Sequence, residues 1–509
     1  MRRVPACAPG AAYLRGMRTT PHRRTGIRLR PPAHPVLPTS PGFWRSPLRG
    51  PWFTSVLGLV LLFGLLVVFV TGLLSYAAYN PSLSPVNDKT PDKGVLGFYL
   101  FDWPTDPHWL YRLTQGVHVT LGLALIPVVL AKLWSVVPRL WSLPPVRSLA
   151  HGAERLSLLL LVGGVLFQFA TGVLNIQLDY LFPGSFYPLH FYGAWVFFAA
   201  FALHAALRFP QALRTLRSGE LRTRGTRGKG DAHHDGEHDE DEDEDEDEDG
   251  SRTGASTHAG PGTGPGTGTG TAPHGAHAKL AASATGLAST GAELASPDPA
   301  PGTLTRRGAL GVVGAGSALL VVTTVGQSIG GPLRETALFA PHGGGEPGGG
   351  PGGFQINKTM AAVGVRVQQT GEAWRLAVEG RAGTVRLSRT DLLAMRQYGA
   401  ALPIACVEGW STPDQDWRGV RLRDLARLAG YRDGPLPDLL VESLQTRGAF
   451  RRAALRANQV ADPRSLLALA VNGAPLTPDH GFPARVIVPA APGVLNTKWV
   501  ARLTFGDLT

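Results

Sequence analysis

Histidines lie within the long apolar runs of this 509-residue sequence, where an ionisable side chain is costly and usually serves a function. His190 and His204 are fourteen residues apart in one such run. At about 100° and 1.5 Å per residue, a helix would place them on nearly the same face and about 21 Å apart. This is the spacing needed to hold two stacked haems, because haem iron takes an axial imidazole from either side.

Each haem would need a second histidine at matching depth. His118 lies about one turn inside its apolar run and is predicted to pair with His190 at an outer haem. His151, just before another run, is predicted to face His204 at an inner haem. The alternative for each histidine is a polar residue at the level of the lipid headgroups. Small residues would let the helices and a flat macrocycle approach closely: Gly163, Gly164, Gly172, Gly193 and Ala194.

The chain has only two cysteines, Cys7 and Cys406. The membrane topology predicted from the arginines places them on opposite sides of the bilayer, which excludes a disulfide between them. Cys406 is therefore either a buried thiol or a metal ligand. Thiolate is a soft ligand that suits a redox-active metal.

Five apolar runs are each about 20 residues long, the length of helix that crosses a bilayer. They cover residues 52–76, 114–137, 156–177, 190–209 and 309–329. We therefore predict an all-α transmembrane helical bundle in the lipid bilayer, with residues 51–210 as a four-helix domain and residues 304–330 as a fifth helix.

Arginines before the first run, between the second and third, and after the fourth all fall on one side of the predicted bundle. By the positive-inside rule that side is cytoplasmic. Membrane topology explains the net charge of +11 more simply than nucleic-acid binding does, so we predict no nucleic-acid partner. The N-terminus, with its disordered basic arm at 1–50, is predicted to be cytoplasmic.

Residues 211–303 combine an Asp/Glu alternation with Gly, Thr, Pro and Ala repeats. Such a sequence cannot bury enough apolar surface to fold, which predicts a disordered cytoplasmic linker. His233, His234 and His238 beside the acids leave metal binding open as an alternative. A second, Gly-rich linker is predicted at 331–353.

The segment Thr305-Arg306-Arg307-Gly308-Ala309-Leu310 precedes the fifth apolar run and resembles a twin-arginine export signal, with Ala309 where the signal usually has Phe. The resemblance implies that a folded C-terminal domain crosses the membrane with its cofactor. The alternative is that the two arginines only mark the cytoplasmic side. Both interpretations place the residues beyond about 330 outside the cytoplasm.

Residues 354–509 are predicted to form an α+β domain. Short alternating runs predict strands at 374–378, 384–387, 439–443 and 484–488, and helical spacing predicts helices at 389–397 and 421–429. The order of these elements lacks the βαβ rhythm of a parallel sheet.

Four segments of this domain resemble the molybdopterin domain of the sulfite oxidase family. They are residues 404–411, 417–425, 466–476 and 480–489, the last followed by Thr497-Lys498-Trp499. The resemblance implies that Cys406 is the catalytic ligand of molybdenum. It also implies that His480, Arg485 and Lys498 bind the anionic pterin or its phosphate, and that Asn357 reaches the cofactor. The alternative for Arg485 and Lys498 is an exposed charge on a strand.

Sulfite oxidases have arginines directly after this cysteine, whereas this chain has Glu408-Gly409-Trp410-Ser411. An acid and an indole would not favour sulfite. The domain is more similar to the minimal bacterial members that pair with a membrane haem protein, some of which reduce sulfoxides. The bundle resembles the cytochrome b subunits of bacterial respiratory oxidoreductases, which exchange electrons with quinones.

These resemblances imply a membrane-bound, molybdopterin-dependent oxidoreductase that carries out oxo transfer outside the cytoplasm on a small-molecule oxo donor or acceptor. One or two b-type haems would exchange electrons with the quinone/quinol pool. One alternative is a non-catalytic membrane electron carrier whose C-terminal domain is a docking module. Another is a membrane-anchored partner-binding protein without haem.

Overall fold

The computed structural model describes residues 46, 48–83, 86–87, 101–140, 148–176, 186–217, 304–340, 348–448 and 450–508. Most of the predicted basic arm and all of the predicted linker beyond Arg217, with His233, His234 and His238, lie outside these residues. The first seven residues of that linker belong to the fourth long helix.

Within the described part of the chain, five helical segments are long and apolar enough to cross a membrane, as predicted. In hydrocarbon the backbone must satisfy its own hydrogen bonds, and a helix does so within one segment. The helices are α1 (Pro51–Ala78), α2 (Leu110–Leu140), α3 (Leu149–Asn175), α4 (Tyr187–Arg217) and α6 (Arg306–Val322), followed by the short α7 (Gly326–Ile329).

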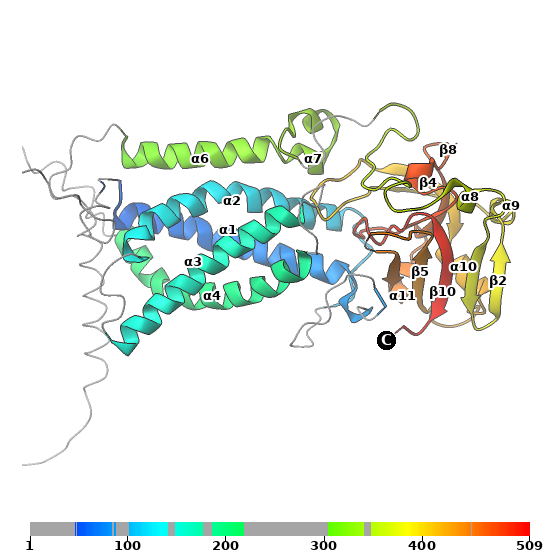
Figure 1. Ribbon diagram of the computed structural model, residues 1–509, viewed down its shortest axis with the longest axis horizontal. Helices are drawn as coiled ribbons and strands as arrows, with labels where there is room; N and C mark the ends of the chain where they lie inside the picture. The colour runs from blue at the N-terminus through cyan, green and yellow to red at the C-terminus, as the bar shows by residue number, and fades with distance from the viewer. Residues whose placement is uncertain are drawn as a thin grey trace, which may run out of the picture.

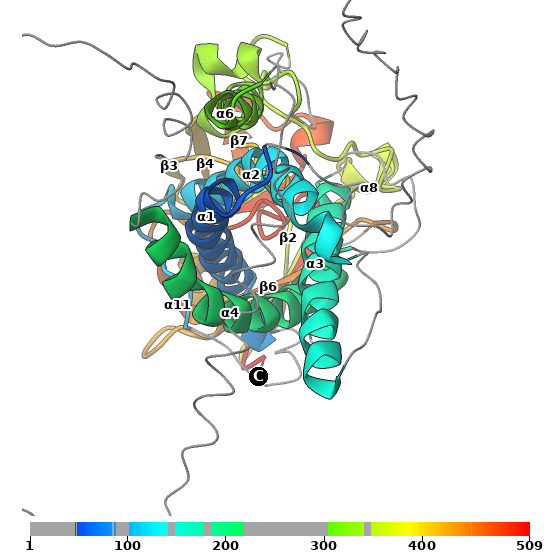
Figure 2. The same cartoon turned by 90° about the vertical axis from the view of Figure 1, so that its left-hand side faces the viewer.

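The first four long helices form two hairpins, α1 with α2 and α3 with α4, joined along α1 and α4 (Figure 1). Viewed along the bundle, they surround a common centre, and α6 packs outside them against α2 (Figure 2). Glycine allows close approach at the first hairpin, because a Cβ on Gly64 would lie 2.8 Å from Leu125 Cδ2. The apolar core between these helices includes Phe53, Leu57, Leu61, Leu125, Val165 and Phe197.

The fifth span was predicted as one run at 309–329, but the structure divides it. Helix α6 ends at Val322, and the hydroxyls of Thr323 and Thr324 donate to the carbonyls of Leu319 and Leu320. After a turn, α7 begins at Gly326, where the chain of Gly331–Thr336 (η3) crosses so closely that a Cβ would overlap Leu333 O. The break therefore depends on a residue without a side chain.

The C-terminal domain contains two sheets in its described residues. One has the strand order β2-β1-β10-β5-β6, with β1 and β10 parallel and the other pairs antiparallel. The other has the order β3-β4-β7-β8, with β9 also paired to β7. The strands are β1 (Leu376–Gly380), β2 (Gly383–Leu387), β3 (Tyr398–Leu402), β4 (Gln415–Arg421), β5 (Asp438–Ser443), β6 (Arg452–Leu455), β7 (Leu466–Val471), β8 (Ala474–Pro475), β9 (Arg485–Ile487) and β10 (Val500–Gly506).

Short helices cover these sheets and complete the predicted α+β domain: α8 (Val367–Thr370), α9 (Arg389–Ala394), α10 (Leu422–Leu428) and α11 (Ala457–Ala461). Helix α9 is shorter than predicted and begins at a capping box. In this box Ser388 Oγ accepts from Asp391 N, and Asp391 Oδ2 accepts from Ser388 N. The main core lies between the sheets and helix α10, and includes Leu376, Val378, Leu425, Leu439 and Val486.

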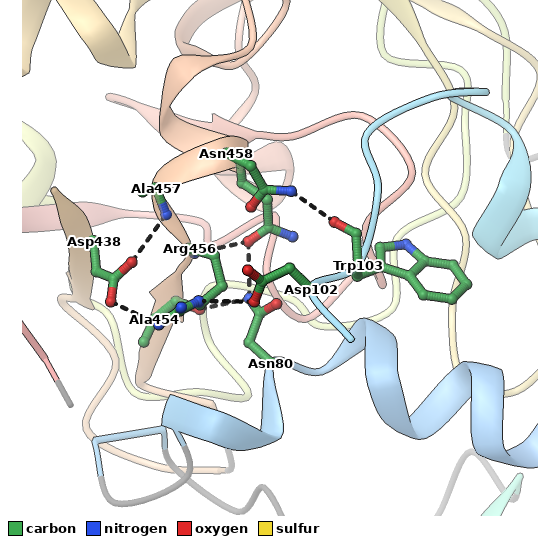
Figure 3. Close-up of polar contacts among 9 residues, drawn as sticks. Asn80, Asp102, Trp103, Asp438, Ala454, Arg456, Ala457 and Asn458 are labelled. Carbon is green, nitrogen blue, oxygen red and sulfur yellow. Dashed lines mark hydrogen bonds and ion pairs between the residues drawn. The ribbon is translucent and has the colours of Figure 1, made fainter. Parts of the chain in front are cut away.

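The C-terminal domain lies at one end of the bundle, against the end of α1 and the start of α2 (Figure 1). The loop before α2 contacts it closely. Trp103 Nε1 donates to Ala490 O at 2.7 Å, and Asn458 Nδ2 donates to Trp103 O at 2.9 Å. Beside this pair, Arg456 joins Asp102 of the loop to Asp438 of β5 (Figure 3). The loop before α2 and the C-terminal domain therefore share one side of the bundle.

Candidate functional site

His118 on α2 and His190 on α4 come together inside the bundle. Their ring centroids are 6.2 Å apart, and the ring planes are nearly perpendicular at 88°. An imidazole nitrogen lies about 2 Å from a metal that it binds. Two such bonds plus the distance from each nitrogen to its ring centre give about this separation. The predicted pair could therefore hold one iron between them.

The Nδ1 atom of each histidine is held by a neighbouring helix. His118 Nδ1 lies 2.9 Å from Val68 O and 3.3 Å from Thr71 Oγ1 on α1. His190 Nδ1 lies 3.1 Å from Thr171 Oγ1 on α3, whose hydroxyl already donates to Phe167 O. With Nδ1 protonated and donating, Nε2 of each ring carries the lone pair that a metal requires.

A glycine beside each threonine makes room for the imidazole. A Cβ on Gly72 would lie 3.0 Å from His118 Cε1, and one on Gly172 would lie 3.2 Å from His190 Cε1. The two hairpins thus build their histidine positions in the same way.

A short repeat in the sequence marks these positions. The segments Phe69-Val70-Thr71-Gly72 and Phe169-Ala170-Thr171-Gly172 share three of four residues. Sequence reasoning found Gly172 but missed the repeated pair.

The two histidines line one cavity of about 160 Å³ among α1, α2, α3 and α4. Its walls are mainly apolar and include Leu65, Val68, Leu123, Ile126 and Phe197. His204 is partly exposed and does not line this cavity. His151 falls in α3, but its side chain lies outside the described residues. The pairing of His151 with His204 stays a prediction.

Cys406 lies in a tight turn of the C-terminal domain and is buried, with 3% of its surface exposed. Cys406 N donates to Trp410 O at 2.9 Å, and Gly409 N donates to Cys406 O at 3.0 Å. Burial raises the pKa of this thiol well above its usual value, and the neighbouring Glu408 raises it further. In the absence of a metal, the protein environment therefore favours the protonated thiol.

The turn that carries Cys406 is inserted against the histidine cavity. Val407 lines that cavity together with His118 and His190. Gln115 Nε2, one turn before His118, donates to Val407 O at 2.5 Å. The same helix also meets Gly409 of this turn, which packs so closely on Val119 that a Cβ would lie 2.8 Å from Val119 Cβ. The residue directly after Cys406 therefore forms part of the cavity wall, a juxtaposition that sequence reasoning did not find.

Helix α7 holds the same turn from its other side. Ser411 Oγ donates to Ser328 O at 2.6 Å, and Ser411 N donates to Gln327 O at 2.9 Å. Ser328 Oγ also donates to Gly409 O. Arg112 of α2 donates to the carbonyls of Ser328 and Ile329. The position of the cysteine turn is thus set jointly by α2, α7 and the C-terminal domain.

Three basic residues of the C-terminal domain are buried close together: His480, Arg485 and Lys498 are 1%, 2% and 8% exposed. The alternative that Arg485 and Lys498 are surface charges on strands is therefore wrong. Arg485 donates to the carbonyls of His480 and Asn496, and Lys498 to those of Lys358 and Asp479. Among the described residues neither cation forms an ion pair with a carboxylate.

Burial lowers the pKa of all three residues. It lowers the pKa of His480 to about 4 and that of Arg485 to about 9, and it places the pKa of Lys498 well below its usual value. Buried cations without an anionic partner are costly, so an anionic ligand would stabilise them.

Asn357 lies with Lys498 on the wall of a second, smaller cavity of about 30 Å³, next to Asn496 and Thr497. On this wall the buried Asn496 Nδ2 and Thr497 Oγ1 have no hydrogen-bond partner in the structure, and elsewhere in the domain Arg485 Nε and Gln355 Oε1 also have none. Gly493, on the same wall, donates to Ala405 O at 2.6 Å, next to Cys406. The unused donors Arg485 Nε and Asn496 Nδ2, with the hydroxyl of Thr497, fit an anionic ligand that accepts hydrogen bonds.

The comparisons with known proteins concern this C-terminal domain. Residues 362–508 match the model of the oxidoreductase molybdopterin binding domain. The oxidoreductase YuiH of Bacillus subtilis is 33% identical over 149 residues, which cover 26% of this chain and 65% of that protein. Mitochondrial sulfite oxidase of Drosophila melanogaster is 29% identical over 158 residues, covering 27% of this chain and 28% of that protein. NAD(P)H nitrate reductase of Hordeum vulgare is 40% identical over 94 residues, covering 17% and 10%.

The chain therefore spans slightly under two thirds of the Bacillus protein and under a third of the two named enzymes. The relationship applies to the domain around Cys406 and leaves most of the chain, including the helical bundle, outside it.

Proposed function

Because its C-terminal domain is a molybdopterin-binding oxidoreductase domain of the sulfite oxidase family, we propose that this chain is a membrane-bound oxidoreductase that carries out oxo transfer outside the cytoplasm. Electrons of this reaction pass between the C-terminal domain and the quinone/quinol pool by way of b-type haem in the bundle. Its substrate is a small-molecule oxo donor or acceptor.

One observation carries this proposal. Val407 lines the cavity between His118 and His190, and it directly follows the candidate molybdenum ligand Cys406. Electron transfer between two centres requires that they lie close together in a fixed arrangement. The contacts of Val407 with Gln115 and of Gly409 with Val119 provide that arrangement without movement of the domain.

The residues around Cys406 fit the molybdenum cofactor. The thiolate of Cys406 would hold the metal, Arg485 and Lys498 would neutralise the anionic pterin, and His480 would bind it as a neutral imidazole. Asn357, which shares a cavity wall with Lys498, would reach the cofactor. Bound molybdenum supplies two-electron oxo transfer, and the protein supplies orientation and electrostatics. In the described residues no carboxylate forms an ion pair with Arg485 or Lys498, so a bound anion would offset the cost of burying their charges.

The residues in the bundle fit a haem. His118 and His190 would provide the two axial imidazoles, and Thr71 and Thr171 would fix their tautomers. Bound haem iron supplies one-electron transfer. A second haem between His151 and His204 remains part of the proposal, so the chain would hold one or two haems.

The residues after Cys406 favour a substrate without negative charge. Glu408 Oε2 accepts from Trp410 Nε1 at 2.5 Å, which keeps the acid within the cysteine turn. A carboxylate at this position would repel sulfite. A neutral oxo donor or acceptor, such as a sulfoxide or an N-oxide, is the substrate class that this turn suits.

The membrane orientation follows the arginine distribution. Helix α6 begins at the end of the bundle opposite the C-terminal domain (Figure 1), and its first residues are Arg306 and Arg307. Thr305 caps the helix by accepting from Gly308 N at 3.0 Å. If that end is cytoplasmic, the C-terminal domain is extracytoplasmic. The twin-arginine resemblance remains part of this proposal.

The test is combined metal and haem analysis of the full chain purified in detergent, followed by a substrate screen with reduced quinol analogues. We expect one molybdenum and at least one bis-imidazole haem per chain, with the haem oxidised when a suitable oxo donor is added. Protein with haem but no molybdenum would support the electron-carrier alternative. Protein with neither would contradict the proposal.

A further inference from the structure

The cavity that contains His118 and His190 is more polar at one end than at the other. One turn from the histidines, on the side of the C-terminal domain, four polar residues line it: Ser75, Gln115, Asn175 and Tyr187. We call these residues the polar tier. Each of the four bundle helices contributes one of them, from its first or last two turns.

The sequence spacing shows how the tier is built. Gln115 precedes His118 by three residues on α2, and Tyr187 precedes His190 by three on α4. Ser75 and Asn175 each follow a histidine-holding threonine by four residues, on α1 and α3. Residues three or four apart share a helix face one turn apart. On the other side of the histidines Gln168 of α3 is the polar residue of the lining, and its Nε2 is also unpaired. The rest of that side is apolar, with Leu123, Ile126, Ala194 and Phe197.

Two atoms of the tier are buried and have no hydrogen-bond partner, Tyr187 Oη and Gln115 Oε1. An unpaired buried polar atom is costly and implies a ligand that pairs with it. Tyr187 Oη can donate, and Gln115 Oε1 can accept while Gln115 Nε2 donates to Val407 O. A protonated carboxyl group offers the complementary acceptor and donor.

We infer that the polar tier binds the propionic acid groups of the tetrapyrrole and directs that edge towards the C-terminal domain. The inference rests on the haem of the proposed function and adds the orientation of the ligand. No Lys, Arg, Asp or Glu side chain lines the cavity in the described residues. At least one propionic acid is therefore held neutral, because an ionised one would lack a cation in an apolar site. The carboxyl edge then lies beside Val407, next to Cys406.

The test compares haemin with haemin dimethyl ester, whose carboxyl groups are blocked. Full-length protein is purified in detergent from haem-limited cells, and each pigment is titrated while the bis-imidazole absorbance spectrum is recorded. We expect haemin to bind about tenfold more tightly, as is typical when one buried polar group loses its partner. In Tyr187→Phe and Gln115→Leu the ratio of the two affinities, haemin over haemin dimethyl ester, should fall towards one.

Tyr192→Phe is the matched control, because Tyr192 lies on the same helix but is exposed and does not line the cavity. It should keep the wild-type preference. If the wild type binds both pigments with equal affinity and each gives a bis-imidazole spectrum, the polar tier does not bind the propionic acid groups. The haem proposal would be left intact. Failure of both pigments to give that spectrum would overturn both.

A second measurement covers variants that fold poorly. The resonance Raman band from propionate bending in the wild-type holoprotein should shift in Tyr187→Phe and not in Tyr192→Phe. An unchanged band in Tyr187→Phe with retained haem would contradict the inference.

Discussion

Val407 O accepts a hydrogen bond of 2.5 Å from Gln115 Nε2, which joins the residue after the lone thiol of the C-terminal domain to the helix that carries His118. The contact is buried on the side of Gln115 and is supported by the packing of Gly409 on Val119. Two segments 292 residues apart in the chain therefore meet between two candidate redox centres. The fusion of bundle and domain in one chain is consistent with a fixed path between the centres.

Replacing Cys406 by serine should affect the molybdenum site and leave the haem site unchanged. A serine hydroxyl is a poor ligand for a soft-metal site, so we expect loss of most molybdenum and of substrate turnover. The haem spectrum should be unchanged, because His118 and His190 are not touched. Metal analysis and a reduced-minus-oxidised spectrum of the same sample check this. Full molybdenum content and turnover in Cys406→Ser would contradict the assigned role of the thiol.

The glycine behind His190 should be needed for haem binding. In Gly172→Val the added side chain would start 3.2 Å from His190 Cε1 and extend further, which displaces the imidazole. We expect a several-fold lower haem content and a changed ligand spectrum. Gly163→Val on the same helix is the control, because a Cβ there meets nothing within 4 Å. Equal haem loss in both variants would point to general damage of α3.

The sequence predicted the elements whose periodicity is strong. The membrane spans follow from apolar length alone, and His118 and His190 followed from the cost of an ionisable side chain in such a span. The α+β fold followed from motifs and from alternating strands such as β2 and β5. Strand β7 was identified only as a motif, because it is buried on both faces and lacks alternation.

The rest depends on contacts between distant segments, which one sequence does not encode locally. The parallel pairing of β1 with β10 joins residues over a hundred positions apart. The contact of Val407 with the histidine cavity arises from the docking of two domains. The Thr-Gly pairs at 71–72 and 171–172 were readable as a repeat, but their role became clear only when each lay beside an imidazole.

The cofactor-free protein should lose stability in acid because of His480. Its pKa in the folded state is about 4, below the ordinary value of about 6.5, owing mainly to burial. Between these values the unfolded chain binds more protons than the folded one, so stability rises with pH. We expect the thermal midpoint of the full-length protein from molybdopterin-deficient cells to fall as the pH decreases from about 6.5 towards 4.

His480→Asn is the matched variant, since asparagine does not titrate in this range. Its midpoint should depend less on pH over the same window. If the two proteins show the same pH dependence, His480 does not carry the effect.

The contact between the C-terminal domain and the bundle should depend on the buried hydrogen bonds of Asn80 more than on the ion pair between Asp102 and Arg456. Asn80, 2% exposed, donates to Ala454 O at 3.0 Å and to Gln459 Oε1 at 2.8 Å (Figure 3). Asn80→Ala leaves these acceptors without that donor, which should cost about 1–3 kcal/mol. Asp102→Asn removes a pair with Arg456 in which the Asp102 side chain is half-exposed, and should cost less than about 1 kcal/mol. Hydrogen exchange of the β6 amides in the full chain measures both effects. Faster exchange in Asp102→Asn than in Asn80→Ala would show that charge dominates this interface.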